Sequence, residues 1–240
     1  MTVVQGAFMT RSGRTLTVVN ASVANDTETE ILSGGLNQNA QADVNFGQYG
    51  VNEVITHGAI FMGNDAENHV AWLEAPTGQV IIPLPTTNAG TYCGMPELCA
   101  PIRLMTGMSI KVLVTASGAA ATAYLSAYGP QKSDIFKVDN VAAGGAGVEQ
   151  QFTSVKTGQS IGNSLVGVTV TKMKCSAGTD PDAAVTALWP FAYVKSSEGY
   201  VKGAVGISQF VDGDGYNIQS KFSDVTIPIK QNDKAFITAP

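Results

Sequence analysis

The chain has 240 residues, enough for one large domain or two small ones, and it buries roughly 70% of its unfolded surface without help from disulfides or metals. Charged residues make up 14% of the chain, against roughly 25% in ordinary soluble domains. A hydrophobic fraction of 44% with a net charge of −5 excludes a disordered chain. No stretch approaches the about 18 uninterrupted apolar residues of a membrane span.

Short apolar or alternating runs bounded by Gly, Pro, Asn, Asp and Ser recur along the chain and predict an all-β fold. In chain order, strands are predicted over residues 15–20, 28–32, 53–62, 69–74, 79–84, 109–115, 121–128, 135–138, 152–155, 165–174, 185–194, 200–205, 217–220 and 224–229. One helical turn is predicted over residues 96–99, where a proline stands at the first position. The fold class that follows is an antiparallel β-sandwich or barrel with long loops and little helix.

The domain organisation is predicted to be a single β-rich domain over residues 1–240. A subdivision into 1–138 and 148–240 is the alternative, because the segment 139–147 is rich in glycine. Residues 109–128 resemble residues 165–193, but the spacing between the two segments drifts, so no repeat of fixed period is predicted. The first twelve residues and residues 235–240 are expected to be arms on neighbouring subunits, or frayed ends.

Two apolar runs contain prolines, which cannot donate a hydrogen bond to a strand ladder. Residues 80–85 and 225–229 are therefore predicted to be edge or terminal strands. Prolines at an edge also block open-ended strand pairing.

Cysteine usage favours reduced thiols. Cys93, Cys99 and Cys175 cannot all pair, and a disulfide between Cys93 and Cys99 is the alternative. No C-x-x-C pair suggests zinc. The first fourteen residues lack the apolar core of a secretory signal, so we expect folding in the cytoplasm.

A G-x-S-x-G motif at Gly158–Gly162 matches the nucleophile elbow of α/β-hydrolases. That elbow needs a general-base histidine later in the chain, whereas the two histidines, His57 and His69, both precede it. We therefore interpret the motif as a polar turn.

The densest group of possible metal ligands is Asp65, Glu67 and His69, which share one face of an extended strand. His57 could join them. The preferred interpretation is a hairpin of residues 53–62 and 69–74, in which His57 faces Glu74 as a cross-strand charge pair.

Residues 212–217 begin like a calcium loop, but the later ligand positions of an EF-hand are not met, so a tight turn is predicted. The local basic clusters are Lys172 with Lys174 and Lys195 with Lys202, and nearby acidic residues balance them, which favours a solvated strand face over nucleic-acid binding. No catalytic, cofactor-binding or metal-binding residue is therefore assigned.

Several features together resemble the structural proteins of bacterial or archaeal virus particles. They are the strand 109–115 leading through a Ser-Gly-Ala turn into Ala-Thr-Ala-Tyr-Leu-Ser-Ala-Tyr at 121–128, the lysine-poor background rich in Thr, Ala, Gly and Asn, and an unprocessed Met1. Within that class, jelly-roll capsid proteins of tailless icosahedral viruses are the nearest comparison, which implies a jelly-roll-like antiparallel β-sandwich. The segment 148–240 is short for a second barrel.

The resemblance implies a non-enzymatic capsid shell subunit in the virion, folded in the host cytoplasm and without a cofactor. Its partners are copies of itself, as a trimer, pentamer or hexamer, and other virion proteins. It implies no membrane span and at most weak contact with nucleic acid. Low charge density suits such contacts, because little charge is desolvated between copies.

A tail-tube or decoration protein is the nearest alternative function. A carbohydrate-binding module or adhesin, with Trp72, Trp189 and Tyr193 as an aromatic platform, is another. A cupin-like metalloenzyme using His57 and His69 is a third. No Lys or Arg occurs in the 88 residues between Arg14 and Arg103, so we expect much of 15–102 in the core or at subunit contacts.

Overall fold

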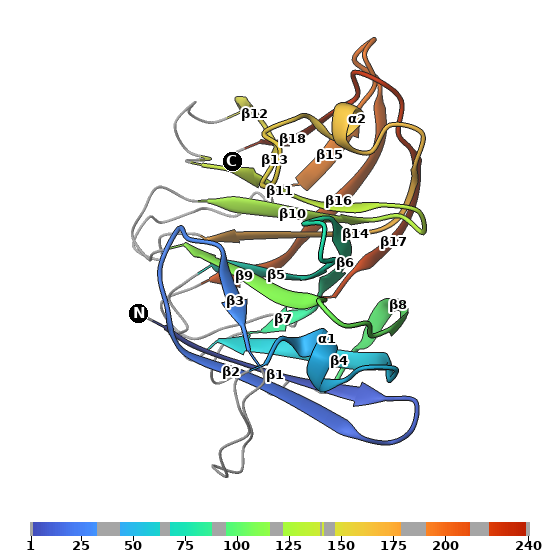
Figure 1. The fold of residues 1–240 in the computed structure, drawn as a ribbon. Coiled ribbons are helices and arrows are strands. Elements are labelled where there is room, and N and C mark those ends of the chain that lie inside the picture. Colours follow the sequence, from blue (N-terminus) through green and yellow to red (C-terminus); the bar gives the residue numbers. More distant parts are fainter. Residues whose placement is uncertain are drawn as a thin grey trace. The chain divides into compact units, whose positions relative to one another are not determined.

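The computed structural model describes residues 2–32, 44–62, 68–87, 95–115, 122–139, 141, 147–178, 191–211 and 221–238 (Figure 1). Of these described residues, 60% lie in strands and 5% in helices, and the sheets are mostly antiparallel. The expected all-β sandwich class is therefore confirmed. Within these residues, no helix is long and apolar enough to cross a membrane.

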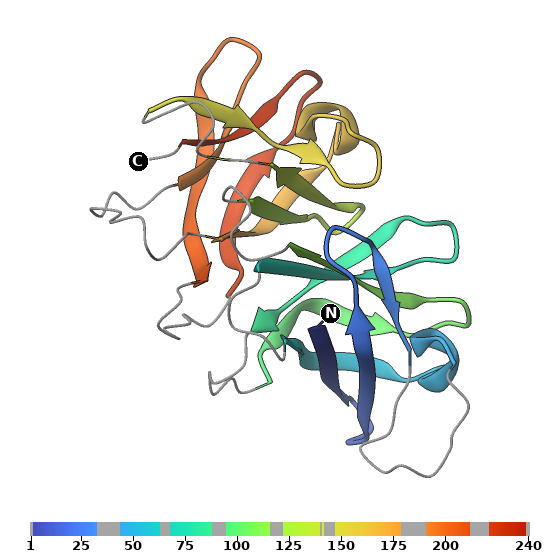
Figure 2. The ribbon, with the colours of Figure 1, turned by 90° about the vertical axis from the view of Figure 1, so that its left-hand side faces the viewer.

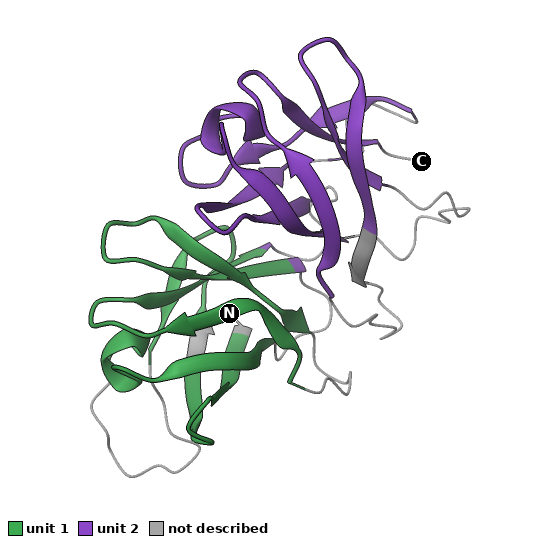
Figure 3. Cartoon of the chain, turned by 90° about the vertical axis from the view of Figure 1, so that its right-hand side faces the viewer, with its two compact units in different colours: residues 1–65, 69–114 green, residues 66–68, 115–240 purple. Residues whose placement is uncertain are grey.

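The chain divides into two compact units (Figure 3). The first comprises Met1–Asp65 and His69–Val114, and the second comprises Ala66–Asn68 and Thr115–Pro240. The boundary thus falls at Val114 and not in the Gly-rich segment 139–147. Strand β11 (Ser133–Val138), before that segment, pairs with β13 (Thr153–Ser154), after it, inside the second unit.

The first unit contains two sheets, and the first of them is ordered β2-β1-β4-β7, with β8 also paired to β4. These strands are β1 (Thr2–Thr10), β2 (Thr15–Val23), β4 (Val54–Met62), β7 (Thr86–Thr87) and β8 (Glu97–Arg103). The β1–β2 hairpin is blue in Figures 1 and 2. Because β1 pairs on both sides, the expected N-terminal arm is wrong. The helical turn predicted over 96–99 is also wrong, because β8 occupies it.

The other sheet of the first unit is ordered β3-β9-β5-β6. Its strands are β3 (Thr29–Ile31), β5 (Asn68–Glu74), β6 (Val80–Leu84) and β9 (Ser109–Thr115). The proline-containing β6 lies at the edge of the sheet, as predicted. A short helix, α1 (Phe46–Tyr49), precedes β4, and the Asn45 side chain caps it by accepting from Gln48 N–H at 2.9 Å.

The period-two pattern of β1 and β2 fills the interior of the first unit. Val4, Phe8 and Leu16 are fully buried, and the Phe8 ring packs against the Phe46 ring with centroids 5.0 Å apart. In the segment without Lys or Arg, β5 is buried along its whole length and β6 along most of it. These strands meet the expectation that the segment is rich in buried residues.

The second unit holds one nine-stranded sheet, ordered β12-β18-β15-β16-β14-β10-β11-β13, with β17 also paired to β14. Its strands are β10 (Ala123–Tyr128), β11 (Ser133–Val138), β12 (Glu149–Gln151), β13 (Thr153–Ser154), β14 (Thr169–Gly178), β15 (Phe191–Lys195), β16 (Val201–Val211), β17 (Ser223–Pro228) and β18 (Lys234–Thr238). The expected C-terminal arm is wrong over 235–238, because β18 pairs with both β12 and β15.

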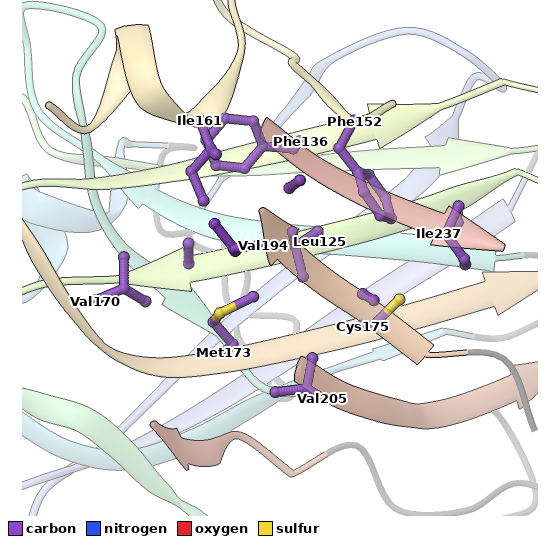
Figure 4. Close-up of a cluster of buried hydrophobic side chains, with 14 of the residues drawn as sticks. Leu125, Phe136, Phe152, Ile161, Val170, Met173, Cys175, Val194, Val205 and Ile237 are labelled. Atoms are coloured by element: carbon purple, nitrogen blue, oxygen red, sulfur yellow. The ribbon is translucent and has the colours of Figure 1, made fainter. Parts of the chain in front are cut away.

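One segment, residues 149–154, pairs with both ends of this sheet. Its first half pairs with β18 and its second half with β11. Between them, Phe152 donates its backbone N–H to Ala235 O at 2.9 Å and buries its side chain fully. Figure 4 shows that side chain with Phe136, Leu125 and Val194 in the core that the strands of this unit enclose.

The two units share one strand order. In the first unit, the strands form two sets of four neighbours, β2-β1-β4-β8 and β3-β9-β5-β6. They correspond, strand by strand, to two sets within the nine-stranded sheet of the second unit, β11-β10-β14-β17 and β12-β18-β15-β16. The short helices correspond as well, since α1 precedes β4 and α2 (Ile161–Ser164) precedes β14. The structure therefore contains a repeat that spans half the chain.

The repeat extends to a matching turn in each unit. Residues 75–79 join β5 to β6, and residues 196–200 join β15 to β16, with the same two backbone hydrogen bonds at 2.8–3.0 Å. Gly78 and Gly199 hold the same place in these turns at φ +82 and +89, a conformation that favours glycine.

A second match lies where each helix contacts the turn before the last strand of its unit. Gly47 N–H donates to Met108 O at 2.8 Å, and Gly162 N–H donates to Asp233 O at 2.9 Å. A Cβ on either glycine would lie within 2.3 Å of backbone atoms of that turn. Both corners therefore need glycine for close packing.

The two segments that resemble each other in sequence, 109–128 and 165–193, do not reveal this repeat. They contain β9–β10 and β14–β15, which are not corresponding strands. Strands β1, β7, β8, β12 and β18 were also not predicted. The strand predicted over 217–220 and residues 185–190 of another lie outside the described residues.

Candidate functional site

The G-x-S-x-G motif forms a polar turn, as interpreted from the sequence. Gly158 has φ +70, and Ser160 stands at the N-cap of the four-residue helix α2. Gly162 is buried against the backbone of the turn at Asp233. The motif thus positions a helix corner.

The predicted pairing of His57 with Glu74 is wrong. His57 lies on β4, where it faces Met9 and Glu97, and its Nδ1 lies 2.9 Å from Thr56 Oγ1. Glu74 lies on β5 in the other sheet of the unit. The order of strands separates the two elements that a simple hairpin would join.

No metal centre emerges from the described residues. His69 is buried on β5, away from the sheet of His57, and Asp65 and Glu67 lie outside the described residues, as do 212–217. Within the ranges that the structure describes, no three His, Cys, Asp or Glu side chains gather to hold a metal ion.

The thiols occupy different environments. Cys99 is partly buried on β8, and Cys175 is buried in the core of the second unit. Burial raises the pKa of the Cys175 thiol to about 12. Cys93 lies outside the described residues, so its predicted pairing with Cys99 stays a prediction.

Of the three aromatic residues considered as a sugar platform, Trp72 is not available at the surface. Trp72 is fully buried and donates its Nε1–H to Glu74 Oε2 at 3.0 Å. Trp189 lies outside the described residues. Tyr193 is partly exposed on β15.

Tyr193 belongs instead to a cluster of aromatic and charged side chains. Its ring centroid is 6.1 Å from that of Phe236 on the neighbouring β18, and Lys195 Nζ lies over both rings, at 5.6 and 5.5 Å. Lys195 also pairs with Glu149 on β12, and the Tyr193 hydroxyl donates to Glu149 Oε1 at 2.7 Å. The same hydroxyl shares a hydrogen bond with Thr238 at 2.8 Å.

These contacts set the protonation of the cluster. The hydrogen bonds from Lys195 and then Tyr193 lower the pKa of the Glu149 carboxyl, and the bond to Glu149 raises the pKa of Lys195. Burial, more than its contacts, raises the pKa of Tyr193. At neutral pH the cluster therefore holds one cation and one anion that compensate each other.

The same side of the sheet continues onto apolar and small residues. Phe191, 55% exposed, lies beside Gly206 of β16, and Tyr193 lies beside Ala204. A Cβ on Gly206 would meet no atom within 4 Å, so this part of the surface is open. We call the surface of Phe191, Tyr193, Lys195, Phe236 and Gly206 the second-unit face.

A contrasting surface lies on the first unit. Val3 and Met9 of β1 are 41% and 43% exposed, on the side of the strand opposite the buried Val4 and Phe8. Gln5 and Ala7 lie between them, so this side of β1 carries no charge. We call the surface of Val3, Gln5, Ala7 and Met9 the first-unit face.

Buried polar groups in the second unit support the fold around α2. Asp134 accepts hydrogen bonds from Ser164 Oγ and from Ile135 N–H, and burial raises the pKa of its carboxyl above the ordinary value. Lys202 Nζ lies 2.5 Å from the carboxylate of Asp233, which is 1% exposed. Both groups anchor turns.

Comparison with known proteins found no match: no family model, curated protein or solved structure resembles this chain. From the sequence, Tyr193 was considered as a platform aromatic and Lys195 as part of a basic cluster, whereas Glu149 and Phe236 were not singled out. The alternation of exposed and buried residues in β15 and β18 was the available signal, and the pairing of these strands was not predictable from it.

Proposed function

We propose that this chain is a non-enzymatic structural subunit of a virus capsid shell, which assembles with copies of itself. The observation that carries this proposal is the strand order that occurs twice in the chain. In an eight-stranded jelly roll, one sheet holds the first, eighth, third and sixth strands, and the other holds the second, seventh, fourth and fifth. Viral capsid proteins, lectins and cupins are built on that fold.

Both units fit this order with one change. If β2 and β11 are counted as first strands, each sheet follows the jelly-roll sequence, and the eighth place is filled by β1 or β10, which comes first along the chain. Two such sandwiches in one chain favour the two-barrel version of a capsid protein.

Surface chemistry supports a structural role over the other jelly-roll functions. The first-unit face is uncharged, and Lys195 of the second-unit face forms an ion pair with Glu149. Such surfaces lose little hydration energy when they are buried between copies. Lectin-like binding is less favoured, because Trp72 is buried and Lys195 covers the rings of Tyr193 and Phe236.

The proposal implies a location in the virion. The partners would be copies of the chain, as trimers, pentamers or hexamers, together with other virion proteins. Size-exclusion chromatography with light scattering, followed by negative-stain microscopy of the purified protein, tests it. Rings of capsomer size or shells are expected. Stacked tubes would favour the tail-tube alternative, and a monomer that binds glycans would overturn the proposal.

A further inference from the structure

Because the strand order is repeated, the exposure of corresponding sheet faces can be compared between the two units. On β1 the side away from the core is exposed, with Val3 at 41% and Met9 at 43%. On the corresponding strand β10, Ala123, Leu125 and Ala127 enter the core. The opposite side of β10 carries Tyr124 and Ser126, each only 1% exposed.

The other sheet has the reverse arrangement. Trp72 and Glu74 on β5 are buried, at 0% and 7% exposed. Their counterparts on β15 are Tyr193 and Lys195, which have the same places relative to the matching turns 75–79 and 196–200. These two are partly exposed, and their neighbour Phe191 is 55% exposed.

Each kind of face is therefore buried in one unit and exposed in the other. We infer that two copies of this chain associate by unlike faces, the first-unit face of one copy packing against the second-unit face of the next. This inference rests on the proposed function and names the surfaces through which the subunits assemble.

The chemistry of the two faces suits this contact. The second-unit face carries Lys195 together with its partner Glu149, and the first-unit face brings no charge against that pair. Burial of Lys195 then keeps its charge paired with Glu149, which costs less than burying it alone. Gly206 leaves open space beside Phe191, into which a side chain such as Met9 of another copy can pack.

Contact between unlike faces is heterologous. Each copy keeps one face free after the first contact, so association continues into rings or larger assemblies. Contact between like faces would stop at a dimer. Only the heterologous arrangement extends to the shell that the proposed function requires.

Three variants of the full chain test the inference. Met9→Glu places a charge on the first-unit face. Gly206→Glu places one on the second-unit face without removing any contact within the chain. Val166→Glu is the matched control, because Val166 is 54% exposed in the second unit but lies on neither face. Thermal melting checks that each variant folds, and Val3→Glu replaces Met9→Glu if the latter does not.

Sedimentation velocity over a concentration series measures self-association. Met9→Glu and Gly206→Glu are each expected to weaken it by at least about tenfold, because an unpaired charge would be buried, and Val166→Glu is expected to leave it unchanged. An equimolar mixture of Met9→Glu and Gly206→Glu should form a one-to-one dimer and nothing larger, since each variant retains one intact face.

A mixture that stays monomeric would overturn the pairing of unlike faces. Wild-type particles that form equally well with both face variants would overturn the inference and leave the proposed function standing. A wild-type chain that forms no assembly at any concentration would instead overturn the proposed function.

Discussion

Gly162 is the position where the structure makes its sharpest prediction about stability. Its backbone N–H donates to Asp233 O at 2.9 Å, which fixes α2 against the turn before β18. A Cβ at this position would lie 2.3 Å from Asp233 N, 2.6 Å from Asp233 O and 2.7 Å from Lys230 O. All three are backbone atoms, so no side-chain rotation relieves the overlap.

The cost of Gly162→Ala follows from these distances. To restore ordinary contacts, the turn must withdraw by about 1 Å, an overpacking that costs roughly 1–3 kcal/mol. The withdrawal also lengthens the hydrogen bond between Gly162 and Asp233, worth about 1 kcal/mol. We expect the free energy of unfolding to fall by about 2–4 kcal/mol, equivalent to about 4–16 °C in Tm for a chain of this size.

Thermal and urea unfolding, followed by circular dichroism, measure the effect. Gly206→Ala is the matched control, because its new Cβ meets no atom within 4 Å, and its stability should stay within about 0.5 kcal/mol of wild type. The close-packing explanation fails if Gly162→Ala melts within about 2 °C of wild type.

Four further predictions concern other positions. Gly47→Ala should also destabilise the protein by about 2–4 kcal/mol in urea unfolding, because its Cβ would lie 2.1 Å from Met105 O; wild-type stability would argue against the structural repeat. Lys202→Met should cost about 3 kcal/mol in the same assay, because it leaves the buried Asp233 carboxylate without its cation; a neutral effect would refute a stabilising ion pair. Burial raises the pKa of Asp134 above 3.8, so this group's contribution to stability is greatest below that pH and is lost as the pH rises through the raised pKa. Asp134→Asn should remove that decline, and urea midpoints of both proteins between about pH 4 and 8 test it; equal pH profiles would contradict it. Cys175, whose thiol pKa is about 12, should react with a thiol reagent at about pH 8 only when the protein unfolds; mass spectrometry of the folded protein would expose rapid labelling at this site.

Local sequence patterns predicted the strands well but not their partners. The strand predicted over 109–115 coincides with β9, and 80–84 is the edge strand that its proline indicated. The alternation that identifies a strand depends on its own residues, whereas pairing depends on elements far away in the chain. His57 was therefore assigned to Glu74 by the register of a hairpin between 53–62 and 69–74, while the structure pairs it with Met9 and Glu97.

The repeat was hidden for a related reason. Its equivalent positions share backbone conformation and contacts, but few of them share the same side chain. Gly78 and Gly199 have the same turn conformation, and Gly47 and Gly162 make the same close backbone contact. Trp72 corresponds to Tyr193, but Trp72 is fully buried whereas Tyr193 is partly exposed. The second-unit face depends on pairing between β12, β15 and β18, which separates its residues widely in sequence.

The position of β1 and β10 has a consequence for how the chain folds. In an ordinary jelly roll the last strand made must insert between two strands made long before it, which closes a long loop and raises contact order. Here each of these central strands is made first and pairs at once with the next strand through a short turn. Exchange of this strand between the two halves of the chain, or between nascent copies, would require a completed hairpin to open. The strand order thus protects two similar sandwiches in one polypeptide from swapping their parts.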